Sequence, residues 1–282
     1  MTPRLSFNTW NHSAVWDLPP TLPEQITAAA AAGYDHIGLD VPSLLAHEAA
    51  GLTAEQIRAH MDEVGISSFE LVPLPLSADP AATEEGLARV VRFAPILGAH
   101  QVLAVVDGEV TGRTIVNIRR CVEQLAALGV GTAIEFLPSV PVNSIEAVER
   151  LLDAVDRPEA RVMVDTWHFF VGPSTWEALD ALPPDRLGFV QFCDGLPAQS
   201  TDVRQEYRQR RVLPGEGIHG LAAFADHVLA RWPDVVVSVE VLSSAWRSRP
   251  VEEFAAATYR STRQFWPVEV HERRGDDDDG RG

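Results

Sequence analysis

The fold of this chain can be inferred from residues 131–168, GTAIEFLPSVPVNSIEAVERLLDAVDRPEARVMVDTWH. Two runs rich in β-branched and apolar residues, GTAIEF and RVMVDTW, predict strands, and NSIEAVERLLDAV between them predicts a helix. A strand, a helix and a second strand in this order favour two parallel strands joined by a right-handed crossover. Both runs carry a carboxylate near their carboxyl end, Glu135 in the first and Asp165 in the second.

The same alternation extends along the whole chain. The runs that predict strands are RLSFNTW, DHIGLD, SSFELVPL, HQVLAVV, GTAIEF, RVMVDTW, LGFVQF and DVVVSVEV, and each precedes a segment with helical character. Thr53 and Gln56 have the spacing of a capping box at the start of one of these helices. Eight such units close most naturally into an α/β fold of the (β/α)8 TIM barrel type, which commonly takes about 250 residues.

A doubly wound open sheet is the alternative architecture. Its usual nucleotide signatures are absent, because the first strand is not followed by GxGxxG and the chain has no GxxxxGK[ST]. We therefore predict a single barrel domain over residues 1–268, and an acidic C-terminal tail over 269–282 that is too charged and too poor in apolar residues to fold.

The amino-acid composition limits the kinds of molecule that this protein could bind. The chain has 23 basic and 40 acidic residues, a net charge of −17, which opposes the phosphate backbone of a nucleic acid. It has no apolar run of about 18 residues that would predict a membrane span, and the N-terminus MTPRLSFNTW lacks the layout of a signal peptide. We expect a cytoplasmic protein that acts on a small molecule, without nucleic-acid or membrane partners, and leave homo-oligomerisation open.

Four polar residues end the last four strand-like runs: Glu135, Asp165, Gln191 and Glu240. In a parallel barrel the carboxyl ends of all strands meet at one face, where active sites are built. Three buried carboxylates repel one another unless a cation neutralises them, so the pattern indicates a divalent metal site. Taken alone, Gln191 is more often a hydrogen-bonded residue of the barrel interior.

Further polar residues follow the strands. His168 lies three residues after Asp165, His12 follows the first strand, and Glu216 belongs to the glycine-rich turn PGEG. Residues 195–213 show no clear strand or helix and predict a lid over the catalytic face. Its arginines could hold a phosphate or a carboxylate, or could be dispersed solvated charges; they are Arg204, Arg208, Arg210 and Arg211.

Taken together, AIEF, DTWHFF, QFCD, PGEG and SVEV resemble the xylose isomerase-like TIM barrel superfamily, in its sugar phosphate isomerase/epimerase branch, which includes ketose 3-epimerases and inosose dehydratases. The resemblance implies that Glu135, Asp165, Gln191 and Glu240 bind one divalent metal ion. Gln191 stands where many members have a histidine, so an all-oxygen site favours Mn²⁺ or Mg²⁺. The arginine that precedes the PGxG turn in the family would be Arg210 or Arg211, of which we assign Arg211 to the substrate.

The predicted function is a metal-dependent isomerase or epimerase of a small polyhydroxylated ketone, a keto-sugar or sugar phosphate, acting through an enediolate. Glu135 and Glu240 would be the acid and base, and His168, Arg211, Glu216 and His12 would contact the substrate. If a hydroxyl on the neighbouring carbon leaves instead, the same chemistry gives a dehydratase or lyase of a keto-sugar or keto-cyclitol. A barrel subunit that binds sugar without catalysis is the third possibility.

Overall fold

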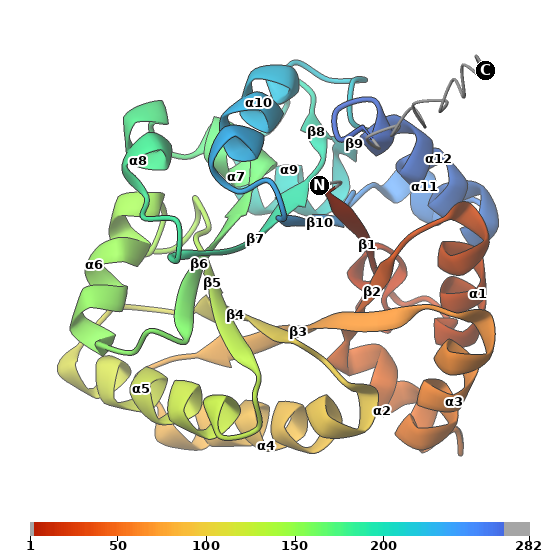
Figure 1. Cartoon of the computed structure of the whole chain (residues 1–282), viewed down its shortest axis with the longest axis horizontal. Coiled ribbons are helices and arrows are strands. Elements are labelled where there is room, and N and C mark those ends of the chain that lie inside the picture. The colour runs from red at the N-terminus through yellow and green to blue at the C-terminus, as the bar shows by residue number, and fades with distance from the viewer. Residues whose placement is uncertain (1–2, 268–282) are drawn as a thin grey trace, which may run out of the picture.

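The computed structural model describes residues 3–267, and these form a closed parallel barrel with helices packed around it (Figure 1). The predicted acidic tail, residues 269–282, lies outside the described residues. All predicted strand runs form barrel strands: β1 (Arg4–Asn8), β2 (His36–Asp40), β3 (Ser67–Leu76), β4 (Gln101–Val106), β5 (Gly131–Glu135), β6 (Ala160–Asp165), β7 (Leu187–Phe192) and β10 (Val236–Val239). The predicted (β/α)8 barrel is confirmed.

The order of strands around the barrel is β1-β10-β7-β6-β5-β4-β3-β2. The ring closes at β1, which pairs in parallel with β2 through Ser6 and His36 and with β10 through Leu5 and Val237. Because every pairing in the ring is parallel, the carboxyl ends of all barrel strands meet at one face.

The outer helices follow the predicted pattern and bury their apolar faces against the strands. They are α1 (Leu22–Ala32), α3 (Ala54–Val64), α4 (Pro80–Leu97), α5 (Gly112–Ala126), α6 (Ile145–Val155), α8 (Trp176–Ala181), α10 (Leu221–Arg231) and α12 (Val251–Arg263). The capping box predicted from Thr53 and Gln56 is formed at the start of α3. Within residues 3–267, no helix combines the length and the hydrophobicity needed to cross a lipid bilayer.

Short helices that the sequence pattern did not predict follow several strands. They are α2 (Val41–Ala49), α7 (Thr166–Val171), α9 (Val203–Gln209) and α11 (Ser244–Arg247), together with the 3₁₀ turns η1 (Thr9–His12) and η2 (Ala14–Trp16). Strand β6 therefore ends at Asp165, and Trp167 and His168 belong to α7 instead of to the strand.

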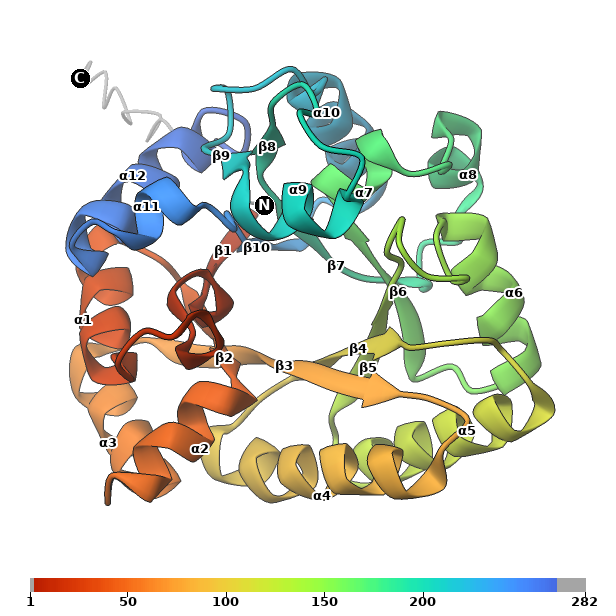
Figure 2. The same cartoon turned by 180° about the vertical axis from the view of Figure 1, so that it is seen from behind.

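The lid segment, residues 195–213, is more regular than the sequence indicated. Its ends belong to a two-stranded antiparallel ribbon of β8 (Asp194–Gly195) and β9 (Arg211–Val212), and α9 lies between them. Asp202 starts α9 by accepting hydrogen bonds from the backbone N–H groups of Arg204 and Gln205. In Figure 2, α9 is the near element over the barrel. The helix was missed because VRQEYRQ is short and has no apolar periodicity.

The side chains inside the barrel show which way the residues at the strand ends point. The interior side chains at this level are apolar and pack on one another: Phe69, Val72, Leu103, Ala133, Met163, Phe189 and Val236. Successive side chains of a strand alternate between faces, so residues two positions further along point to the same interior. Glu135, Asp165 and Gln191 lie two positions after Ala133, Met163 and Phe189, and thus point inward at the carboxyl end of the barrel.

Candidate active site

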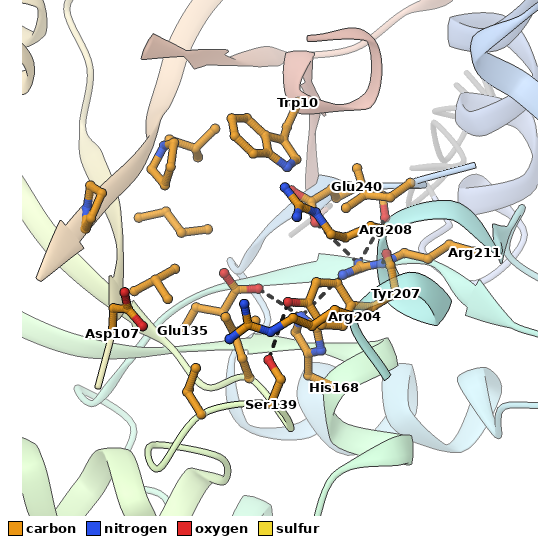
Figure 3. Close-up of a pocket in the computed structure, with 18 residues that line it drawn as sticks. Trp10, Asp107, Glu135, Ser139, His168, Arg204, Tyr207, Arg208, Arg211 and Glu240 are labelled. Carbon is orange, nitrogen blue, oxygen red and sulfur yellow. Dashed lines mark hydrogen bonds and ion pairs between the residues drawn. The ribbon is translucent and has the colours of Figure 1, made fainter. Parts of the chain in front are cut away.

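The four strand-end residues converge on the barrel axis and are all buried. Asp165 and Gln191 are fully buried, and Glu135 and Glu240 are 7% and 6% exposed. Glu135 and Glu240 line a cavity of about 300 Å³ at the mouth of the barrel, together with His168 (Figure 3). This volume suits a small molecule.

Arg211 is the charged centre of the site. Its side chain is 1% exposed, and its Nη1 lies 2.5 Å from Asp165 Oδ2 and 3.3 Å from Glu240 Oε2. Its Nε donates to the carbonyl oxygen of Tyr207 at 2.8 Å, which fixes the guanidinium against α9. Its neighbour Arg210 instead donates to Glu206 at 2.8 Å and to Gln199. The structure thus brings Arg211, and not Arg210, into the site.

His168 is placed by the start of α7. Asp165 Oδ1 accepts a hydrogen bond from the backbone N–H of His168 at 3.0 Å, as a helix-capping residue does. The His168 Nε2 atom lies 3.2 Å from Glu135 Oε1 and 3.3 Å from Arg211 Nη2. The two contacts require different tautomers of the neutral ring: Nε2 accepts in a hydrogen bond with Arg211, which can only donate, and donates in one with the ionised carboxylate of Glu135. Nδ1 is buried and has no hydrogen-bond partner among the described residues.

Burial and neighbouring carboxylates raise the pKa values of the carboxyl groups in the site, whereas the positive charge of Arg211 lowers them, and the balance differs from residue to residue. Burial, reinforced by the charge of Asp165, raises the pKa of Glu135 to about 8. Burial also raises the pKa of Glu240 well above its ordinary range, although Arg211 opposes the shift. Burial disfavours charge on Asp165 as well, but the charge of Arg211, with the hydrogen bonds to Asp165, lowers its pKa.

The imidazole of His168 is neutral near pH 7. Burial lowers the pKa of His168 to about 3, and the nearby Arg211 adds to this effect, whereas Asp165 opposes it. A neutral imidazole can accept a proton or bind a metal ion.

The side chains present fit a divalent metal ion. Glu135, Asp165 and His168 offer ligand atoms that all lie within 4.8 Å of one another. Gln191 Nε2 donates to Glu240 Oε1 at 3.2 Å, whereas Gln191 Oε1 is buried and accepts no hydrogen bond from any described residue. An unpartnered amide oxygen beside carboxylates of raised pKa is what a cation would satisfy. This cluster includes His168, which the sequence assigned to the substrate.

Glu216 and His12, predicted to contact substrate, do not line this cavity. The carboxylate of Asp194 accepts hydrogen bonds from the N–H groups of Gly215, Gly217 and His219 at 3.0–3.1 Å. These hydrogen bonds hold the backbone of the PGEG turn in place. The side chain of Glu216 is exposed to solvent. His12 is half-buried in η1, where its Nδ1 lies 3.1 Å from Thr21 Oγ1, a structural role.

Two further groups line the cavity; the sequence analysis named Arg204 and Arg208 as possible ligands of an anion but missed Tyr207 and the helix that carries all three. Helix α9 contributes Arg204, Tyr207 and Arg208, and η1 contributes Trp10. The Tyr207 hydroxyl lies 3.4 Å from Ser139 Oγ across the cavity (Figure 3). The spacing of four residues between Arg204 and Arg208 was the available signal, because on a helix it places both side chains on one face.

Residues 26–264 match the family model described as xylose isomerase-like TIM barrel. Among curated proteins, the chain is similar to two that are named 3-dehydroshikimate dehydratase. The one from Pseudomonas putida is 27% identical over 260 residues, and the one from Pseudomonas aeruginosa is 26% identical over 261 residues. Each match covers 88% of this chain but only 40% of the relative, so the chain spans well under half of the length of these relatives.

Solved structures share the fold. The IOLI protein with a bound zinc atom has a TM-score of 0.82 at 19% identity, covering 93% of this chain and 97% of that one. The probable 3-DHS dehydratase AsbF of Bacillus anthracis has a TM-score of 0.72 at 15% identity, covering 92% and 98%. A D-allulose 3-epimerase from Methylomonas sp., solved with D-allulose, has a TM-score of 0.72 at 18% identity, covering 94% and 98%.

Proposed function

The chain belongs to the xylose isomerase-like TIM barrel family, and from this premise we propose that it is a divalent-metal-dependent dehydratase of 3-dehydroshikimate. The names of its two curated relatives support this activity at the level of the barrel that they share with this chain. The isomerase or epimerase that we preferred from the sequence has support only from the family as a whole, whereas its dehydratase alternative has support from these relatives.

The proposed reaction follows from the functional groups of the substrate. 3-Dehydroshikimate is a cyclic carboxylate with a ring ketone, a C–H bond beside that ketone, and a hydroxyl group on the next carbon. Removal of that proton and departure of the hydroxyl as water gives a ring with a second double bond. A ring proton then moves to the ketone oxygen, and the product is the aromatic 3,4-dihydroxybenzoate. Atoms balance with one water lost and no oxidant needed.

Glu135 and Glu240 are the groups placed to move these protons. Glu135, with its pKa raised to about 8, is basic enough to accept a carbon-bound proton near neutral pH. Burial also raises the pKa of Glu240 well above its ordinary range, which makes Glu240 the second group able to transfer a proton, here to the departing hydroxyl. Arg211 holds Asp165 and Glu240 in place from beneath the cavity.

We propose that Glu135, Asp165 and Gln191, with Glu240 or His168, hold the metal ion. These donors are mostly oxygen atoms, which favours Mn²⁺ or Mg²⁺ over softer metals. When bound, the ion would supply positive charge to the ketone oxygen where negative charge develops. The observation that carries the proposal is that Glu135 and Glu240 line a cavity large enough for a small molecule, with the buried Asp165 beside Glu135.

The test is incubation of the metal-loaded protein with 3-dehydroshikimate, while ultraviolet absorbance reports the aromatic product. Appearance of 3,4-dihydroxybenzoate that depends on Mn²⁺ or Mg²⁺, and is lost in Glu135→Gln, would support the dehydratase. A parallel panel of ketoses in deuterium oxide covers the alternative. Deuterium incorporation or epimer formation from a ketose, with no aromatic product from 3-dehydroshikimate, would overturn the dehydratase in favour of an epimerase.

A further inference from the structure

The lid helix α9 presents two arginines to the cavity. Arg204 and Arg208 are one helical turn apart, and both line the cavity that Glu135 and Glu240 also line. Their position on the lid, above the buried carboxylates, separates them from the predicted metal ligands. Figure 3 shows both guanidinium groups among the side chains of the cavity.

The other arginines near the mouth have partners that occupy their guanidinium groups. Arg211 is paired with Asp165 and Glu240, and Arg210 with Glu206. Arg247 donates to the carbonyl oxygen of Arg208 and to Gln209 Oε1, and its guanidinium lies over the ring of Trp16.

Arg204 and Arg208 differ from these arginines. Within residues 3–267, neither guanidinium donates a hydrogen bond or forms an ion pair, although that of Arg208 lies 5.3 Å from the centre of the Trp16 ring. Both side chains are exposed. The acids of the lid have other partners among the described residues, because Glu206 pairs with Arg210 and Asp202 caps the start of α9.

Several charged groups surround the two arginines. Burial, together with the charge of Arg208, lowers the pKa of Arg247 to about 10. Arg204, Arg208 and Arg247 also line a neighbouring groove that contains Asp17 and Asp202. At the rim of the cavity itself, Asp107 follows β4 and lies across from Arg208 in Figure 3. No ion pair joins Asp107 to either arginine among the described residues.

A second wall of the cavity is apolar. It is built by side chains of β3 and β4 and by the ring of Trp10, and comprises Trp10, Val72, Pro73, Pro75, Leu103 and Val105. A ligand that fits both walls has a flat hydrocarbon face and an anionic group at one end. A neutral sugar offers the guanidinium groups only hydroxyl oxygens, whereas a carboxylate accepts stronger hydrogen bonds between opposite charges.

We propose that Arg204 and Arg208 form a carboxylate-binding subsite that selects an anionic ring substrate over a neutral ketose. The inference rests on the proposed function for the identity of the ring, but the subsite itself requires only the two arginines and the cavity. An arginine presents its N–H groups in a planar fork that matches both oxygens of a carboxylate.

The subsite can be tested by equilibrium binding, without turnover. The probes are 3,4-dihydroxybenzoate and its methyl ester, which share the ring and hydroxyl groups and differ in the charge of the carboxyl group. Titration calorimetry on the Mn²⁺-loaded protein should give tighter binding of the acid by about 10- to 100-fold, the range expected for hydrogen bonds to a charged group. In Arg204→Met/Arg208→Met, the two affinities should become equal.

The control variant is Arg260→Met, which removes one exposed positive charge from α12, away from the cavity. It should keep the preference for the acid, because the loss of net charge alone would not abolish it. Retention of the preference in Arg204→Met/Arg208→Met, or its absence in the unmodified protein, would overturn the subsite.

Steady-state kinetics separate the subsite from the proposed function. If the unmodified protein dehydrates 3-dehydroshikimate, Arg204→Met/Arg208→Met should raise KM about 10- to 100-fold, each single variant should raise it by less, and kcat should fall by a smaller factor. Dehydration with equal binding of acid and ester would overturn the subsite and leave the function standing. A preference for the acid that depends on the arginines, without dehydration, would support the subsite and overturn the function.

Discussion

Asp40 and Asp165 occupy equivalent positions in the barrel but have opposite surroundings. Each ends a strand, β2 or β6, is fully buried, and accepts a hydrogen bond from a backbone N–H of the helix that follows. Asp40 has only neutral partners, among them the hydroxyl groups of Thr9 at 2.8 Å and Ser13 at 2.6 Å. Asp165 has the guanidinium of Arg211 at 2.5 Å.

The charge of these partners separates the two aspartates. Burial raises the pKa of Asp40 even though hydrogen bonds from Ser13, Ser43 and Thr9 oppose the shift. Burial acts on Asp165 too, but Arg211 reverses the direction and lowers its pKa. A carboxylate at a strand end is therefore not by itself a sign of function. The two aspartates differ because Asp165 is paired with the guanidinium of Arg211, which belongs to the lid, 46 residues further along the chain.

The largest change in activity is expected when the two aspartates are replaced by asparagine, one at a time. Asp165→Asn should lower kcat/KM for 3-dehydroshikimate by about 10²- to 10³-fold, because it removes a predicted metal ligand and the charge that orients Arg211. Asp40→Asn should leave kcat/KM within a few-fold, because the partners of Asp40 are Thr9, Ser13 and Ser43 and include none of the predicted metal ligands. Kinetics on both variants, with the folded fraction measured by circular dichroism, would compare them.

Asp40→Asn is instead expected to reduce the free energy of unfolding by about 1–3 kcal/mol, since an amide N–H₂ would replace one of the buried acceptor oxygens. Equal losses of activity per folded molecule in the two variants would contradict the distinction, because Asp165 would then act only as a helix cap.

A third buried carboxylate, that of Glu70, allows the effect of burial to be tested through the pH dependence of stability. Glu70 of β3 accepts hydrogen bonds from the hydroxyl groups of Ser6 and Ser238 and forms no ion pair with any residue that the structure describes, and its burial raises its pKa to about 7. Gly38 of β2 leaves the space that its carboxyl group fills, because a Cβ atom there would collide with Glu70.

The sign of the pH effect follows from proton binding. Between pH 4.5 and about 7, the native state holds a proton on Glu70 that the unfolded chain releases, so stability falls as the pH rises through this range. Above pH 7 the penalty is constant at about 3 kcal/mol. Glu70→Gln lacks this titration, so urea unfolding from pH 5 to pH 8 should show the variant gaining stability relative to the unmodified protein. Parallel curves would mean that Glu70 titrates normally.

Much of the fold was predictable from the sequence because it depends on local periodicity. The eight strand runs alternate with helical segments, and this order restricts the sheet to a parallel barrel. The same reasoning gathers Glu135, Asp165, Gln191 and Glu240 at one face, since parallel strands share the direction of their carboxyl ends. The burial of all four agrees with that expectation.

The rest of the site depends on contacts that periodicity does not encode. The pairing of Arg211 with Asp165 requires the lid to fold back across the barrel mouth, and the sequence showed neither α9 nor this direction. The outward side chain of Glu216 results from the bonds that Asp194 makes to the backbone of its turn. Side chains on loops are positioned by such partners, so their roles could only be inferred by resemblance.

The smallest change in stability is expected at Asp40, from the loss of a single hydrogen bond to one of its neutral partners. Ser13→Ala removes one hydroxyl donor from Asp40 and should lower the free energy of unfolding by about 1 kcal/mol. In the Asp40→Asn background the same change should cost less, because the charged acceptor has already been removed. Urea unfolding of the unmodified protein, both single variants and the double variant gives this coupling free energy. Strictly additive effects would mean that the hydroxyl does not stabilise Asp40, and burial alone would then have to explain why this aspartate differs from Asp165.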